Sequence, residues 1–121
     1  MIEGLKTLLE YFRDERHRRE DHADEALLAI YAAANETKLY IQDVQRTGKS
    51  KPDREEELSR LWTRAAVPIR RFNADLAERC LIKGDYWVNP SAWTVEQIAQ
   101  FRIGLDDVFR EAKKLLKQLA E

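Results

Sequence analysis

The sequence predicts an all-α protein: an up-and-down antiparallel bundle of three to four long helices, forming a single domain over residues 1–121. Apolar residues recur at alternating steps of three and four through three long segments, which is the spacing of an amphipathic helix. The chain has only four glycines and three prolines, and Gly48, Pro52, Gly84 and Pro90 fall between those segments. With 44% hydrophobic and 36% charged residues, the composition suits amphipathic helices and excludes a disordered chain.

The first helical segment covers residues 2–46. Its middle, residues 13–25, is polar on every side, so two alternatives stay open. One is a turn near residues 20–23, with Asp21 or Asp24 capping a second helix; the other is a single continuous helix. The usual length of helices favours the turn, which we prefer, whereas the absence of a helix breaker favours continuity. The apolar stripe consists of Ile2, Leu5, Leu9, Phe12, Ala23, Ala26, Ile30, Ala33, Tyr40 and Val44.

Thr37 and Asn35 are polar residues within this otherwise apolar helix. Thr37 lies on the stripe, where its hydroxyl can donate to the carbonyl of Ala33. Asn35 is either a register-setting contact between helices or an exposed side chain.

Residues 47–53, "TGKSKPD", break the helix. Gly48 suits a helix C-terminus, and the acidic residues from Asp53 onward suit the first turn of the next helix. Pro68 lies inside the second apolar pattern, which continues beyond it, so we expect one long helix kinked at Pro68. Its stripe consists of Leu58, Leu61, Trp62, Ala65, Ile69, Phe72, Leu76 and Cys80.

The last helix is expected to begin at Thr94, which can form a capping box with Gln97. It would then run unbroken for about 40 Å at 1.5 Å per residue. Gly104 lies beside its stripe and could allow close approach of a neighbouring helix. The stripe consists of Ile98, Phe101, Leu105, Val108, Ala112, Leu115 and Leu119.

Residues 84–94, "GDYWVNPSAWT", are the most aromatic part of the chain. We expect Gly84 to end the preceding helix and the segment to form a loop across one end of the bundle. Tyr86, Trp87 and Trp93 then either fold back as a lid on the core or form an exposed recognition patch. The lid is favoured, because the end of a bundle must be covered.

The composition also limits the classes of function. A formal net charge of −1 gives no global field to attract nucleic acid, which is therefore an unfavoured partner. We find no secretory signal and no apolar run that could span a membrane, so we expect a cytoplasmic protein without a membrane partner. The single cysteine, Cys80, lies among apolar residues and is expected to be buried.

Residues 16–22, "RHRREDH", carry the best enzymatic candidate. The arginine and the histidine, Arg16 and His22, are separated by five residues, and this pattern resembles the motif of HEPN-type ribonucleases. The resemblance covers these seven residues, and it implies a small helical bundle that dimerises to cleave RNA without a metal. Histidine can transfer a proton at the ribose hydroxyl, and arginine can stabilise the developing charge. The alternative interpretation is a solvated, charged turn or helix face.

Other constellations are weaker. Asp14 with His17, and His22 with Glu25, have the spacing of metal ligands, but no second segment supplies a histidine, so we expect neither a metal nor a cofactor. Arg64, Arg70, Arg71 and Lys83 could form a local basic patch that contacts nucleic acid. Pairing with Asp75 and Glu78 is the favoured interpretation of these charges.

The sequence therefore favours a non-catalytic helical interaction module that forms a homo-oligomer or binds a protein partner. The ribonuclease that uses Arg16 and His22 is the alternative. Charged helix that continues beyond a core often packs against another chain, which makes the N-terminal segment the first candidate interface. The candidate interface residues are Leu8, Phe12, Arg16 and Arg19, with Trp87 and Trp93 as a second possibility.

Overall fold

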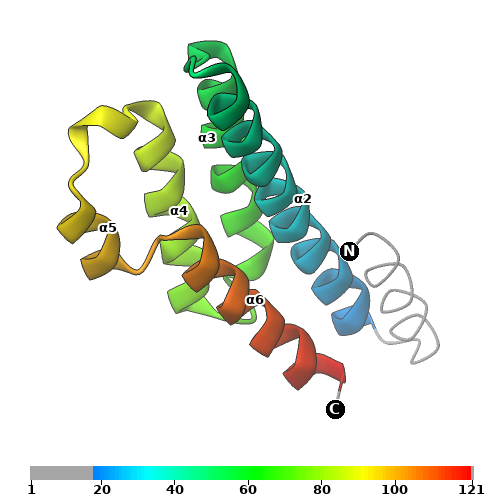
Figure 1. Cartoon of the computed structure of the whole chain (residues 1–121). Helices are drawn as coiled ribbons and strands as arrows, with labels where there is room; N and C mark the ends of the chain where they lie inside the picture. Colours follow the sequence, from blue (N-terminus) through cyan, green and yellow to red (C-terminus); the bar gives the residue numbers. More distant parts are fainter. Residues whose placement is uncertain (1–17, 121) are drawn as a thin grey trace.

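A computed structural model describes residues 18–120 of the chain, with side chains for residues 23–119. The described residues form α-helices, a short 3-10 helix and turns, with no strand, so the predicted all-α class is confirmed (Figure 1). The elements are α2 (Arg18–Thr47), α3 (Pro52–Ile69), α4 (Ala74–Val88), the 3-10 helix η1 (Pro90–Ala92), α5 (Val95–Phe101) and α6 (Leu105–Ala120).

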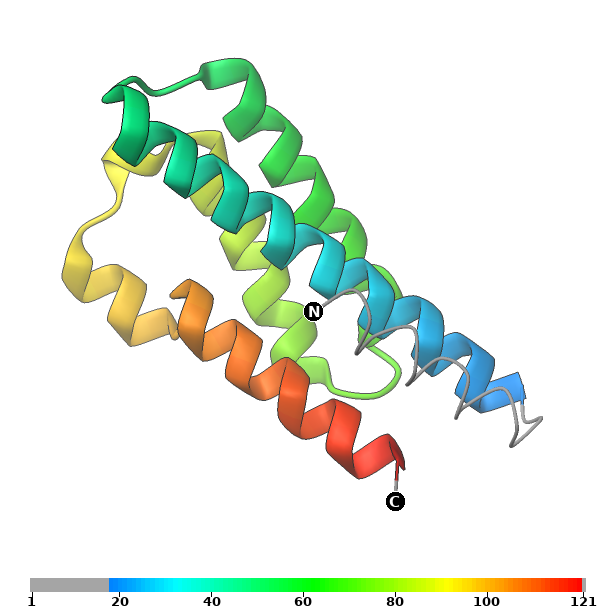
Figure 2. The ribbon, with the colours of Figure 1, turned by 45° about the vertical axis from the view of Figure 1, so that its right-hand side comes forward.

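Helix α3 lies between α2 and α4 and contacts both along its length, and α6 packs against α2 and α4. The chain runs up α2, down α3 and up α4, and then returns along α6 (Figures 1 and 2). The inner faces of these helices share a core of buried apolar side chains. Its largest fully buried member is Trp62, on the inner face of α3.

A polar chain joins α2 to α3 inside this core. The Trp62 indole Nε1 donates to the Thr37 hydroxyl at 2.9 Å, and that hydroxyl donates to the carbonyl of Ala33 at 2.8 Å. The second bond is the one expected from the sequence. Trp62 and Thr37 are fully buried and cannot bond to water. The two bonds therefore give the indole N–H an acceptor and the hydroxyl proton an acceptor inside the core.

Helix α2 runs unbroken from Arg18 to Thr47, so the turn expected near residues 20–23 is wrong. Ala23, Ala26 and Leu27 are buried, and this burial stabilises a helix that continues through the region. The helix ends as predicted at Gly48, which has a φ of +71° and donates its N–H to the Val44 carbonyl at 2.7 Å.

The predicted long helix kinked at Pro68 is also wrong, because α3 ends one residue beyond Pro68. Residues 70–73 reverse the chain, and α4 starts anew after Asn73, whose side chain accepts from the Leu76 N–H at 3.0 Å. The result is an antiparallel helical pair in place of one bent helix (Figure 2). Pro68 lacks a backbone N–H and disfavours a longer α3, and the side chain of Asn73 caps the first turn of α4.

The last predicted helix is broken as well. Thr94 and Gln97 form the expected capping box, but α5 ends at Phe101 and α6 starts at Leu105. Arg102 adopts a left-handed conformation with φ 54°, and the break allows the side chain of Ile103 to be buried. Gly104 contacts no neighbouring helix, and Phe101 is exposed rather than part of the core.

Gly84 does not end a helix as expected; it lies inside α4 where this helix meets α3. Its carbonyl accepts from the Ser59 hydroxyl at 2.8 Å. A Cβ atom at this position would lie 2.4 Å from the Thr63 Oγ1 and 3.2 Å from the Ser59 carbonyl oxygen. The absence of a side chain therefore sets how closely α3 and α4 approach.

We predict that Thr37→Val destabilises the protein by about 1–3 kcal/mol, because the buried Trp62 N–H loses its acceptor while the side-chain volume hardly changes. Urea unfolding would measure the change. Thr47→Val is the matched control: Thr47 makes the same bond to a carbonyl four residues earlier, at 2.8 Å, but at an exposed site. We expect the control to change stability by at most about 0.5 kcal/mol. Equal effects of the two substitutions would contradict the role given to Thr37.

We predict that Gly84→Ala lowers stability by about 1 kcal/mol, since overpacking outweighs the higher helix propensity of alanine. Combining it with Thr63→Ala, which removes the closest atom, should make the same glycine substitution less costly. Thermal unfolding of the single and double variants measures this difference. Gly104→Ala, where a Cβ atom would lie 3.5 Å from the Asp107 Oδ2, should be close to neutral.

Candidate interaction surfaces

The N-terminal candidate residues fall outside the described side chains. Leu8, Phe12 and Arg16 precede the described residues, and the side chains of Arg19 and His22 are not among those described. The ribonuclease interpretation and the N-terminal interface therefore stay predictions.

The aromatic residues of the predicted loop are divided between helix and loop. Tyr86 and Trp87 belong to the last turn of α4, and Trp87 is buried with its ring edge-on to Tyr40, at a centroid distance of 5.6 Å. Trp87 is therefore a core residue, in agreement with the favoured interpretation that it folds back on the core. The alternative, in which Trp87 is an exposed interface residue, is wrong because its ring is not accessible. Trp93 is only half-buried, and its ring packs against Tyr86 at 6.1 Å and Phe101 at 6.0 Å.

Helix α2 carries a second apolar face, opposite the core. At 100° per residue, Leu28, Ala32 and Leu39 point away from Ile30 and Ala33, and all three are exposed. Leu28 is 45% and Leu39 49% exposed, so two large apolar side chains meet solvent on one line of the helix. We call Leu28, Ala32, Asn35 and Leu39 the α2 outer ridge.

The described arginine side chains fall into two groups. Most form ion pairs with carboxylates: Arg46 with Asp43, Arg54 with Glu36 and Glu57, Arg79 and Arg102 with Asp75, and Arg110 with Asp107. The others are exposed and make no ion pair with any described residue; they are Arg60, Arg64, Arg70 and Arg71, which we call the α3 arginine cluster.

The α3 arginine cluster differs from the basic patch expected from the sequence in two respects. Lys83 is buried and does not belong to it, and Asp75 pairs with Arg79 and Arg102 instead of neutralising it. The favoured interpretation of these arginines as salt-bridged surface charge is therefore wrong within the described residues.

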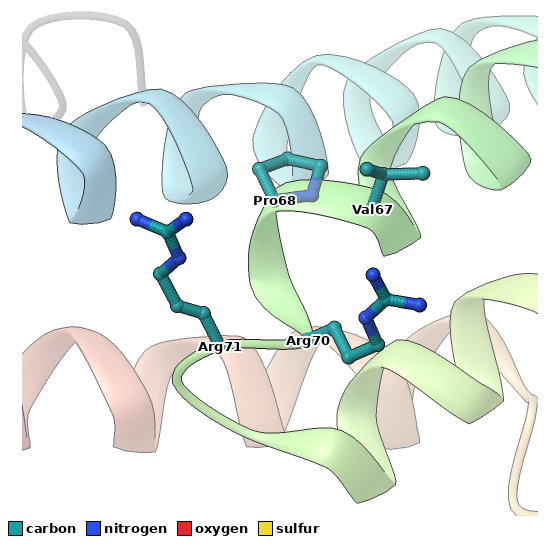
Figure 3. Close-up of a pocket in the computed structure, with 4 residues that line it drawn as sticks. All are labelled: Val67, Pro68, Arg70 and Arg71. Atoms are coloured by element: carbon teal, nitrogen blue, oxygen red, sulfur yellow. The ribbon is translucent and has the colours of Figure 1, made fainter.

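A pocket of about 440 Å³ lies at the end of α3 (Figure 3). The described residues that line it are Val67, Pro68, Arg70 and Arg71. In Figure 3 the Arg71 side chain lies to the left of Pro68 and the Arg70 guanidinium lies below Val67, so two guanidinium groups and two apolar side chains share the lining. Guanidinium groups bind carboxylate and phosphate through paired hydrogen bonds.

Lys83 and Cys80 are the buried groups with reactive side chains. The Lys83 ammonium donates to the Ile103 carbonyl at 2.7 Å and lies 5.4 Å from the centre of the Trp62 ring. Burial lowers the pKa of Lys83 to about 8, and the nearby Cys80 and Asp107 oppose this shift. Burial also raises the pKa of the Cys80 thiol to about 12, so the sequence-based view of Cys80 as a buried apolar side chain is confirmed.

Neither buried group lines the pocket, and Lys83 has a structural role. Its bond to Ile103 ties α4 to the turn between α5 and α6, which the Arg102–Asp75 pair also joins to α4 at 3.5 Å. These contacts hold the start of α6 against the bundle.

Among the described residues, no group of three or more histidine, cysteine, aspartate or glutamate side chains could hold a metal ion. Nor does any helix in this part of the chain have the length and apolar character needed to cross a membrane. In three comparisons with known proteins, no family model, no curated protein and no solved structure matches the chain.

Sequence reasoning missed the α2 outer ridge and Arg60. Leu28 and Leu39 were visible as large apolar residues off the predicted stripe, with Ala32 between them, and this spacing is the signal that could have identified the ridge. Whether a surface arginine has a partner depends on contacts between helices, which the sequence does not reveal.

We predict that Lys83 makes stability rise with pH. The native pKa of about 8 lies below the usual 10.5, so between these values the unfolded chain binds more protons and unfolding becomes less favourable as pH increases. A pKa difference of this size corresponds to about 3 kcal/mol over the whole window. The unfolding free energy of the wild type minus that of Lys83→Met should therefore rise between pH 8 and pH 10.5.

The raised pKa of Cys80 lowers the unfolding free energy above pH 9, which is opposite to the effect of Lys83. Because Lys83→Met keeps Cys80, subtracting the unfolding free energy of the variant at each pH removes most of this contribution. Lys49→Met, which removes an ammonium group from the exposed segment after α2, is the control variant. A free-energy difference for Lys83→Met that does not change with pH would show that the Lys83 ammonium is not desolvated.

Proposed function

We propose that this chain is a non-catalytic helical interaction module that forms a homo-oligomer. The observation that supports the proposal is the α2 outer ridge, an apolar line on the side of α2 that faces away from the core and that no described element covers. Exposed apolar surface of this kind marks interaction sites when it is contiguous. Leu28 and Leu39 lie about 16 Å apart along the helix, at 1.5 Å per residue.

The α2 outer ridge of one copy is complementary to the same ridge of a second copy when the two α2 helices pack antiparallel. In the register that places Leu28 opposite Leu39 of a second copy, Leu39 lies opposite Leu28, and Ala32 lies opposite Asn35. The smaller side chains at the centre allow the backbones to approach, while the leucines interlock at both ends. A two-fold interface requires this kind of self-complementarity.

Charge supports the antiparallel orientation. Exposed Glu25 and Arg46 lie at opposite ends of the ridge. In the proposed antiparallel register, Glu25 of each copy lies about one helical turn from Arg46 of the other, whereas a parallel pair would place like residues together. Asn35, which is half-buried, lies near the two-fold axis, where a polar side chain can fix the register.

We predict a mass above the 14.2 kDa of one chain when light scattering is measured at micromolar concentration. Leu28→Glu combined with Leu39→Glu should dissociate the oligomer, because each buried leucine lost from the interface costs about 2 kcal/mol, or roughly thirtyfold in affinity. Leu28→Glu combined with Leu39→Lys should restore association, since the proposed register places each new acid opposite a new base.

Val88→Glu combined with Val95→Glu is the matched control, because these exposed valines lie at the α4–α5 end of the molecule. The control should keep the mass of the wild type. A monomeric wild type would refute self-association. Dissociation by the control but not by the leucine variant would place the interface at the aromatic end.

A further inference from the structure

The α3 arginine cluster concentrates unpaired positive charge on one surface. Arg60, Arg64 and Arg71 follow one another along the outer face of α3 and the turn that ends it, and Arg70 is their neighbour at the pocket. Successive positions four residues apart are about 6 Å apart along a helix. In a chain whose net charge is −1, and whose other described arginines all contact a carboxylate, this cluster lacks its counter-charge.

The pocket adds an apolar element to this charge. Val67 is 65% exposed, and Pro68 lies beside it between Arg70 and Arg71 (Figure 3). Two apolar side chains with an arginine on each side complement a ligand segment that has an apolar side chain between carboxylates. Protein interfaces often combine an apolar anchor with arginine contacts.

We propose that the α3 arginine cluster and its pocket bind an acidic segment of a partner protein. Carboxylates of the segment pair with Arg70 and Arg71, and an apolar side chain of the segment lies on Val67 and Pro68. Arg60 and Arg64 extend the basic surface along α3, so that further carboxylates of the segment contact the helix. This surface is separate from the α2 outer ridge, and the inference does not depend on self-association.

Nucleic acid fits the same surface less well. Among the residues that the structure describes, no aromatic side chain lines the pocket, whereas proteins that bind single strands use aromatic rings as stacking platforms. The tryptophans of the α4–η1 region lie at the opposite end of α4 from the turn that holds the pocket (Figure 2). An apolar floor between the guanidiniums also has no counterpart in a phosphodiester chain.

A second copy of α3 is also a poor occupant. The exposed carboxylates of this helix are at its start, where Asp53 lies. An antiparallel pair that brought Asp53 to Arg71 of another copy would also bring Arg60 to Arg64, and these like charges repel.

Fluorescence anisotropy tests the proposal on the full chain. The probe is a short dye-labelled peptide in which pairs of glutamates alternate with single leucines. Two further peptides replace every glutamate with glutamine or every leucine with serine, and a labelled thymidine oligonucleotide represents nucleic acid. Arg70→Gln combined with Arg71→Gln removes the pocket charges. Arg110→Gln combined with Lys114→Gln removes the same charge from exposed sites elsewhere, on α6.

We expect the acidic peptide to bind the wild type and the control variant alike, and to bind the Arg70/Arg71 variant at least roughly tenfold more weakly. Both altered peptides should bind more weakly than the probe, and affinity should fall as salt rises. Absence of binding, or equal loss in both variants, would overturn the proposal. Tighter binding of the oligonucleotide through the same arginines would also overturn it, in favour of a nucleic-acid adaptor.

Discussion

The hydrogen bond from Trp62 to Thr37 holds the central helix in register with its neighbour, and the rest of the bundle is arranged around it. Trp62 is the largest fully buried side chain, so its position determines where the inner faces of α2 and α3 can meet. The buried indole N–H requires an acceptor, and the hydroxyl of Thr37 on α2 is that acceptor. Apolar contacts alone would tolerate sliding of one helix along another, whereas this directional bond does not.

Three features of the fold that depend on local chemistry were predicted from the sequence. Gly48 ends α2, Thr94 caps α5, and the Thr37 hydroxyl bonds back to Ala33, because each of these depends on residues within one or two turns. The breaks at residues 70–73 and 102–104 were missed. In both places the apolar spacing of the sequence continues across the break, and periodicity alone does not distinguish a bend from a reversal. At residues 70–73 the helices on both sides, α3 and α4, bury a stripe in the core, whereas α5 buries no residue.

The candidate surfaces were predicted less well, for a different physical reason. A surface site is defined by what its side chains do not contact, and this depends on distant parts of the chain. Asp75 illustrates the point: it lies near the arginines of α3 in sequence, yet it pairs with Arg79 and Arg102 in space. Trp87 shows the converse: sequence reasoning kept it as a possible interface residue, whereas in the structure its ring packs against Tyr40 and Tyr86.

Helix α3 links the stability of the bundle to its surface chemistry. Its inner face carries Trp62 and the close contact with Gly84, so the backbone of α3 is fixed on two sides. Arg60 and Arg64 project from the outer face of the same helix. Side chains on such a fixed element hold their spacing before a partner arrives, which lowers the entropic cost of binding. The residues that organise the core therefore also set the geometry of the α3 arginine cluster.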